Sequence, residues 1–386
     1  MNLPLKKGLK EVIFFFQKFL FYFSKIMTFW ILNKNEEKRV IIGKETANLL
    51  NLYSKLFNCY SINTHKSKYY NNSYSLPLSN FPALVRYIIL PIIYPIVLKK
   101  FSSIWYFSSG SFFLSNDGRE WEFKIAKSNG LKIICFYMGA DIRSLKLIRE
   151  HSESIDLDHW SNYISDESII DRSDQRSKVY SSASNRYAHA IFNCEKDQAS
   201  YINKNHMIPL PVSRNKYLLN TGKWGDTSTI KILHSPSSPI NKGTQIVMSA
   251  IKKLQMENYK FDFKFLSGVP QSKVLKELDE AHIALNEFYA YVPGLFGVEA
   301  LEANCLLLTS ASKKYEPSLF NGCDYAWVPT MYYQIYDHLK YYLDNIDQAK
   351  IQADKGTIWA KKFCSHEASI DYVNSIVKPK CSAKIL

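Results

Sequence analysis

The sequence predicts an α/β protein built from two doubly wound domains, each with a parallel sheet. Short β-rich runs alternate with segments of helical periodicity, and this alternation occurs in two successive series. A proline-rich stretch without periodicity, residues 207–217, separates the series and is expected to be the interdomain linker. A chain of 386 residues is long enough for two domains of ordinary size, each with its own core.

In the first series, strands are expected within residues 39–43, 59–65, 102–111, 131–144 and 189–194. Residues 64–80 are polar and are expected to form a loop. The apolar segment 81–101 contains Pro82, Pro91 and Pro95, so it is expected to form short helices that pack on the core.

In the second series, strands are expected within residues 229–238, 261–270, 282–287, 306–312 and 324–329. Two amphipathic helices are expected to close the chain, at about 331–347 and 348–377. Ligands of doubly wound sheets bind beyond the carboxyl ends of the strands. With two such domains, the cleft between them is the expected binding place.

The net charge of +14 favours anionic partners, namely nucleic acid, an anionic membrane surface or phosphorylated ligands. No zinc-ligand spacing, helix-turn-helix signature or ribonucleoprotein aromatic motif is visible, and lysines are spread along the chain, so nucleic acid is not expected. The seven cysteines are scattered and form no C-x-x-C pair, which argues against a metal site or a disulfide framework and predicts a reducing cytosol.

Residues 1–36 are expected to form a basic amphipathic segment at a membrane interface. Charged residues interrupt the apolar run, which argues against a signal peptide or a spanning helix. Glu11, Lys18 and Lys25 recur every seven residues on one helical stripe, and the remaining face is largely aromatic and aliphatic. The alternative is a helix packed on this protein's own body or on a second copy. Earlier lysines would add attraction to anionic lipid: Lys6, Lys7 and Lys10.

Two motifs of the second series are candidates for anion and hydroxyl binding. Lys242 and Gly243 stand at a helix start, where backbone N–H groups attract anions and a lysine adds a full charge. In GLFGVEALEA, Gly294 and Gly297 would let backbone N–H groups approach a ligand, and Glu299 could accept hydrogen bonds from a sugar diol. The alternatives are a surface lysine beside a turn and a carboxylate that complements the helix dipole.

In the first series, YMGADIRS places Asp141 and Arg143 after a buried strand. An acid–base role, hydroxyl recognition and an ion pair that closes the turn all remain open for these two residues.

Taken in order, SSGS, GADIR, the proline-rich linker, HSPSSPINKGT, LSGVP and GLFGVEALEA resemble the motifs of bacterial glycosyltransferases of family four, over about residues 38–377. That family has the GT-B architecture, in which two Rossmann-like domains face a cleft that holds a nucleotide-sugar. The resemblance implies an acceptor domain at 37–213, a nucleotide-sugar domain at 214–365, and a terminal helix within 366–386 that crosses back to the first domain.

The resemblance also implies roles for matching positions. Glu299 matches the glutamate that binds the nucleotide ribose, and Lys242 matches the lysine near the diphosphate. Further donor contacts are implied at Gly243, Gly268, Val269, Gly294, Leu295, Phe296 and Gly297. Contacts to the donor sugar or acceptor are implied at Gly110, Gly139, Asp141 and Arg143. The candidate catalytic residues are Asp141 and Lys242.

The sequence departs from the family pattern at three positions. Tyr291 stands where the family has a second glutamate, Ser237 where an arginine is common, and Met138 where a histidine is frequent. Neutralisation of the donor phosphates is therefore expected to depend mainly on Lys242.

The resemblance implies a retaining, metal-independent transferase that moves a sugar from a nucleotide-sugar to a glycan or a polyprenyl-linked acceptor. Composition and the basic start suggest an enzyme of bacterial surface polysaccharide (O-antigen, capsule or lipopolysaccharide), peripheral on the cytoplasmic face of the inner membrane. No cofactor beyond the donor is expected, and a homo-oligomer is compatible with the sequence. Two other functions stay open, a sugar-nucleotide epimerase and a non-catalytic GT-B partner or glycan-binding subunit.

Overall fold

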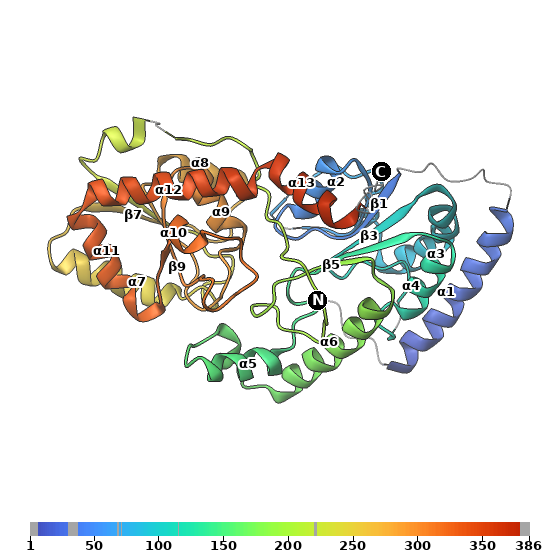
Figure 1. Cartoon of the computed structure of the whole chain (residues 1–386). Coiled ribbons are helices and arrows are strands. Elements are labelled where there is room, and N and C mark those ends of the chain that lie inside the picture. Colours follow the sequence, from blue (N-terminus) through green and yellow to red (C-terminus); the bar gives the residue numbers. More distant parts are fainter. Residues whose placement is uncertain are drawn as a thin grey trace, which may run out of the picture.

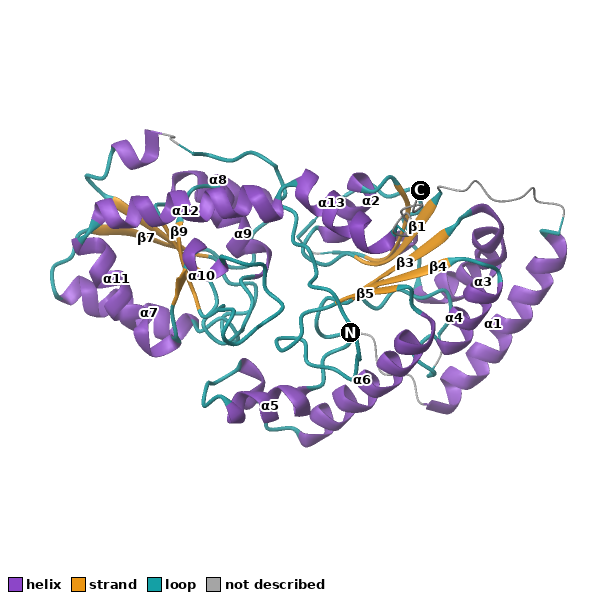
Figure 2. Ribbon diagram, viewed as in Figure 1, coloured by secondary structure: helices purple, strands orange, loops and turns teal. Residues whose placement is uncertain are grey.

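The computed structural model describes residues 7–29, 38–67, 69–70, 72–114, 116–219 and 222–378. The chain folds into two lobes, each with a five-stranded sheet between helices (Figures 1 and 2). All strand pairs within the two sheets are parallel. The predicted pair of doubly wound α/β domains is therefore confirmed.

The N-terminal lobe has the strand order β2-β1-β3-β4-β5, so its order reverses between β1 and β3. Its strands are β1 (Arg39–Lys44), β2 (Cys59–His65), β3 (Ser103–Phe107), β4 (Lys132–Phe136) and β5 (Ala190–Phe192). Its helices are α1 (Lys7–Met27), α2 (Leu49–Leu56), α3 (Ala83–Lys100), α4 (Glu120–Ser128), α5 (Leu145–Ser154) and α6 (Glu167–Tyr187). Every residue of β3 is buried, as expected for a parallel strand covered on both faces.

The C-terminal lobe repeats this topology with the order β10-β9-β8-β6-β7, which reverses between β6 and β8. Its strands are β6 (Ile230–His234), β7 (Phe261–Phe265), β8 (Ile283–Leu285), β9 (Leu306–Thr309) and β10 (Val328–Pro329). Its helices are α7 (Thr244–Met256), α8 (Gln271–Glu280), α9 (Gly294–Glu302), α10 (Cys323–Ala326), α11 (Ile335–Asp344) and α12 (Ile346–Cys364).

The expectation of short helices in the apolar proline segment was wrong, because α3 is one helix with Pro91 and Pro95 inside it. Pro91 has no N–H to donate to the carbonyl one turn earlier, that of Tyr87. The side chain of Gln17 on α1 replaces this donor, with Nε2 2.8 Å from the Tyr87 oxygen. A contact distant in the chain thus satisfies the carbonyl group that the proline leaves free.

The C-terminal region also differs from the expected pair of helices. The described residues there form α11, α12 and α13 (His366–Val377). The last break falls at Ser365, whose side chain caps α13 by accepting from the Ala368 N–H. Helix α13 lies on the N-terminal lobe (Figure 1), where the Tyr372 ring contacts Phe192 of β5 at 6.2 Å.

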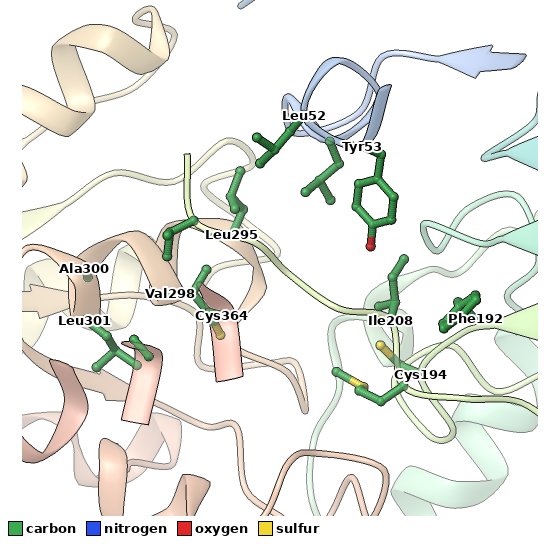
Figure 3. Close-up of a cluster of buried hydrophobic side chains, with 14 of the residues drawn as sticks. Leu52, Tyr53, Phe192, Cys194, Ile208, Leu295, Val298, Ala300, Leu301 and Cys364 are labelled. Carbon is green, nitrogen blue, oxygen red and sulfur yellow. The ribbon is translucent and has the colours of Figure 1, made fainter. Parts of the chain in front are cut away.

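A large hydrophobic cluster spans the two lobes (Figure 3). Leu52 and Tyr53 of α2, Ile208 of the linker and Leu295 of α9 all belong to it. The Tyr53 hydroxyl donates to the Pro209 carbonyl at 2.6 Å, which ties α2 to the linker. The lobes therefore meet through a shared core along one side of the cleft.

Helix α1 packs along α3 on the outer flank of the N-terminal lobe (Figure 1). Its polar residues Gln17, Ser24 and Thr28 are buried toward the protein, and Ser24 Oγ donates to the Ile92 carbonyl at 2.6 Å. Phe21 is fully buried beside them, whereas most of the other aromatic and aliphatic residues of α1 are exposed. Within the described part of the chain, no helix combines the length and apolar character needed to cross a membrane.

Candidate active site

A cavity of about 220 Å³ lies between the lobes. Its C-terminal wall is built at the carboxyl ends of β6, β7 and β8, where the strand order of that sheet reverses. This is the place where doubly wound sheets bind their ligands. Lys242, Gln271 and Leu295 lie at the starts of α7, α8 and α9, so three helix N-termini, each with a partial positive charge, line the cavity.

Lys242 lines this cavity and is paired with a carboxylate that sequence reasoning missed. Its Nζ lies 2.7 Å from Oε2 of Glu287, and both side chains are largely buried. Burial raises the pKa of Glu287, and the charge of Lys242 opposes that rise. Glu287 follows β8 after one intervening residue, Asn286, and a carboxylate just beyond the carboxyl end of a buried strand was the available signal.

Glu299 lines the same cavity from the second turn of α9. Its Oε1 accepts from Ser213 Oγ and from Gln271 Nε2, each at 2.5 Å. Among the described residues, no hydrogen bond reaches its Oε2. Burial raises the pKa of this carboxyl to about 7.

Glu302, one turn further along α9, has a different environment. It is fully buried and accepts from the Lys216 N–H at 2.7 Å and from Arg214 Nε at 3.4 Å. It therefore holds the end of the interdomain linker and does not line the cavity described above.

The predicted donor-binding glycines divide into two groups. Gly268 lines the cavity, as do Val269 and Phe296. The others shape the turns behind the wall: Gly243, Gly294 and Gly297. A Cβ on Gly297 would lie 2.7 Å from Pro293 Cβ, so close packing of the loop requires glycine there.

Asp141 and Arg143 do not line the cavity between the lobes. The Asp141 carboxylate accepts from the Met138 N–H at 3.0 and 3.2 Å and so closes the turn after β4. Its burial raises its pKa. Gly139 lies in the same turn with φ 117°. Gly110 lies where the strand order reverses, and a Cβ there would approach the Ile42 carbonyl oxygen to 2.2 Å.

Arg143 forms an ion pair with Asp197, with Nη2 2.9 Å from Oδ2. The other oxygen of Asp197 accepts from the Tyr291 N–H at 2.9 Å, so this network links the two lobes. The ring of Tyr291 is buried 5.1 Å from that of His159. Tyr291, where the resemblance implies a glutamate, therefore packs in the interface between the lobes.

The N-terminal lobe contributes Ala47, Tyr69 and Tyr70 to the cavity. Sequence reasoning assigned the tyrosines to a polar loop without a role. Burial raises the pKa of Tyr70, and the charges of Glu299 and Glu45 raise it further. The phenol thus stays neutral and faces the same space as the ribose-binding candidate.

No protein-family model matches the chain, and no curated protein matches it in sequence. Solved structures do match. Sucrose-phosphate synthase from Thermosynechococcus elongatus is 11% identical, with 88% of this chain and 98% of that chain covered and a TM-score of 0.59. The HepE protein of Anabaena in complex with UDP-glucose has the same identity and coverage and a TM-score of 0.55. A glycosyltransferase from Rickettsia africae is 11% identical, with 94% and 95% covered and a TM-score of 0.50.

The matches cover 95% to 98% of these chains, so they concern the whole fold. The two parallel sheets of the present chain have the same strand order as each other. The carboxyl ends of the strands in the C-terminal sheet face a cavity between the lobes. The chain therefore has the GT-B fold.

Proposed function

We propose that this protein is a glycosyltransferase that moves a sugar from a nucleotide-sugar to a glycan or lipid-linked acceptor. The observation that carries the proposal is the composition of the interlobe cavity. A lysine, three helix starts and a carboxylate with an unused oxygen converge there. This set is complementary to a diphosphate joined to a ribose diol. The HepE structure, of the same fold, contains UDP-glucose.

In this proposal the diphosphate lies against Lys242 Nζ and the N-terminus of α9. Oε2 of Glu299 accepts hydrogen bonds from the ribose hydroxyls, while Oε1 stays bonded to Ser213 and Gln271. The nucleobase lies against the turn at Gly268 and Val269.

We propose a retaining reaction by front-face attack, in which the leaving phosphate oxygen takes the proton of the acceptor hydroxyl. Such a reaction requires no protein nucleophile. Negative charge develops on the departing diphosphate, and the preorganised ammonium of Lys242 and the helix starts stabilise it. Because protein groups neutralise the charge of the departing diphosphate, the reaction needs no metal ion. A metal chelator should therefore leave the activity unchanged. A catalytic role for Asp141 stays a prediction, since its carboxylate is engaged by its own turn.

We further propose that the enzyme acts on the cytoplasmic face of a bacterial inner membrane, in surface-polysaccharide synthesis. The support is the exposed side of α1, named here the α1 aromatic face. Phe15 is 78% exposed, Phe19 62% and Ile26 73%. Its other members are Leu9, Val12, Phe16, Tyr22 and Phe23. Exposed apolar surface bordered by lysines is typical of a helix that lies in a membrane interface.

The test is a thermal-shift panel of nucleotides and nucleotide-sugars, followed by calorimetry and a transfer assay with the best ligand. A ligand that binds the folded state raises its apparent stability. We expect a nucleoside diphosphate and its sugar to raise the melting temperature, and the sugar to be released or transferred. If no nucleotide-sugar binds or reacts, the proposed function is wrong.

A further inference from the structure

A second cavity, of about 210 Å³, lies in the N-terminal lobe between α1 and α3. It opens at the carboxyl edge of the sheet, since His65 ends β2 and Ser109 follows β3. The wall of this cavity also includes Lys10 and Gln17 of α1 and Arg86 of α3. None of the described residues that line it is acidic.

The cationic groups of this cavity are only partly used. Arg86 Nη1 donates to the Thr64 carbonyl, and the described contacts give no acceptor to the rest of its guanidinium. Lys10 has no ion-pair partner among the described residues. Burial, with the nearby charges of Arg86 and Lys44, lowers the pKa of His65 to about 4, so this ring is neutral near pH 7. Lys10 and Arg86 therefore make the cavity electropositive before any ligand binds.

The charges behind the cavity wall oppose one another. Glu122 is buried there and accepts from Ser111 Oγ at 2.6 Å and from the Phe112 N–H at 3.1 Å. Arg119 is buried nearby, and its guanidinium lies 5.0 Å from the ring of Tyr180, which lines the cavity. Burial raises the pKa of Glu122 to about 7, so its negative charge is incomplete near neutral pH and does not outweigh that of Arg119. The groups behind the wall therefore do not make the inside of the cavity negative.

The position of the cavity indicates the kind of anion. Helix α1 supplies Lys10 to the cavity and presents the α1 aromatic face to solvent. The last residue of β2, His65, lines this cavity, and the loop that follows contributes Tyr69 and Tyr70 to the interlobe cavity. An amphiphile with its hydrocarbon chain in the membrane would therefore meet cationic groups on the path from α1 to the cleft.

We propose that this second cavity binds the phosphate of a lipid-linked acceptor whose hydrocarbon chain stays in the membrane beside α1. The inference rests on the proposed function for its meaning in catalysis, because it names the acceptor of that reaction. The binding event itself requires no donor and can be measured alone.

The experiment compares neutral vesicles doped with a polyprenyl phosphate, neutral vesicles doped with phosphatidylglycerol at equal charge, and soluble pyrophosphate. The full chain and the variants Lys10→Glu and Lys25→Glu are assayed by co-sedimentation. The two variants remove the same charge from the same helix, but Lys25 does not line the cavity. Loss of a charge-assisted hydrogen bond should weaken capture by the polyprenyl phosphate vesicles about tenfold in Lys10→Glu.

We expect the full chain to prefer the polyprenyl phosphate vesicles, and only Lys10→Glu to lose that preference. In the transfer assay, Lys10→Gln should raise KM for the lipid acceptor and leave donor binding unchanged. Equal capture by both anionic vesicles would overturn the proposal in favour of bulk attraction. Equal effects of the two variants, or competition by soluble pyrophosphate as strong as by lipid, would also overturn it. Since the vesicles contain no nucleotide-sugar, failure of donor binding leaves these readouts intact.

Discussion

The ammonium of Lys242 already has an anionic partner in this structure, the carboxylate of Glu287 at 2.7 Å. A buried pair of this kind loses hydration on both groups, and removing one partner leaves the other charge uncompensated. Glu287 therefore holds the lysine at the cavity wall. In the proposed function, a diphosphate would compete with Glu287 for this ammonium.

The variant Lys242→Ala should bind the donor nucleotide about 10- to 100-fold more weakly, since a charge-assisted hydrogen bond contributes about 1.5–3 kcal/mol. Calorimetry measures this directly. Lys252→Ala, on the exposed side of the same helix, is the control and should bind as the full chain does. Lys242→Ala should also lower the folding stability, because it leaves the buried charge of Glu287 without a partner. The double variant Lys242→Ala/Glu287→Gln should regain that stability but not the affinity for the donor. Unchanged affinity in Lys242→Ala would remove the lysine from the site.

Glu299 couples stability to pH. Its folded-state pKa of about 7 lies above the ordinary value of 4.5. Between these values the folded protein holds a proton that the unfolded chain has lost, so stability falls as the pH rises through this window. The penalty is complete above about 7 and absent below about 4.5.

Glu299→Gln keeps an oxygen for Ser213 and Gln271 and removes the buried charge. We expect it to stabilise the protein at about pH 8 by on the order of 3 kcal/mol, and to have little effect below about pH 4.5. Its donor affinity should fall, because an amide nitrogen replaces Oε2. Denaturant unfolding at both pH values measures the first effect. A stability change of the same size at both pH values would contradict the assignment.

At the scale of the element, one glutamine makes the polar contacts that accompany the burial of Phe21 when α1 docks. Gln17 Nε2 satisfies the carbonyl that Pro91 leaves free in α3, and its Oε1 accepts from the Leu114 N–H at 2.8 Å. The inward side of the helix combines these polar contacts with the rings of Phe14 and Phe21, which pack on Phe113 and Trp121. The aromatic side is left facing outward, where a membrane can cover it.

The double variant Phe15→Ser/Phe19→Ser should fold normally, because both rings are exposed. It should bind anionic vesicles at least about tenfold more weakly, since each buried aromatic ring contributes about 1.5–3 kcal/mol. Co-sedimentation measures the loss. Met256→Ser removes an equally exposed apolar side chain from the other lobe and should have no effect. Vesicle binding that survives the double variant would exclude the α1 aromatic face as the docking surface.

At the scale of the whole molecule, the lobes are coupled through a shared core rather than through the linker alone. Helix α13 begins beside the linker, where His366 Nε2 lies 2.9 Å from the Val212 carbonyl oxygen. Its Tyr372 ring contacts Phe192 of the N-terminal sheet and Phe320 of the C-terminal lobe. The side chain of Tyr372 thus bridges both lobes and packs against the hydrophobic cluster that they share.

Tyr372→Ala should destabilise the protein by about 2–3 kcal/mol, somewhat less than loss of a fully buried aromatic ring. It should also separate the melting of the lobes, which we expect to unfold together in the unaltered chain. Differential scanning calorimetry reports both effects. Tyr341→Ala, which removes an exposed ring of α11, is the control and should change neither. A single unshifted transition in Tyr372→Ala would show that α13 does not couple the lobes.

Much of the fold follows from the sequence because strand and helix periodicities are local. The runs at residues 39–43 and 306–312 each contain a strand, and glycines mark several of the turns that follow strands. Lys242 could be singled out because it stands at a helix start after such a strand. Glu299 could be singled out by the glycines before it, but α9 begins at Gly294 and places this carboxylate in the second turn. The helix through Pro91 could not be predicted, since its missing donor is replaced from a distant segment.

The sequence by itself therefore determined the alternation of elements, the parallel character of both sheets and the helix starts that form the candidate site. Only the tertiary structure decided which side chains meet. It placed Glu287 rather than residue 291 beside Lys242, brought Tyr70 across the cleft to Glu299, and turned Gln17 toward α3. The reason is physical: periodicity is a property of neighbouring residues, whereas these contacts join residues that only the packing of two lobes and an added helix brings together.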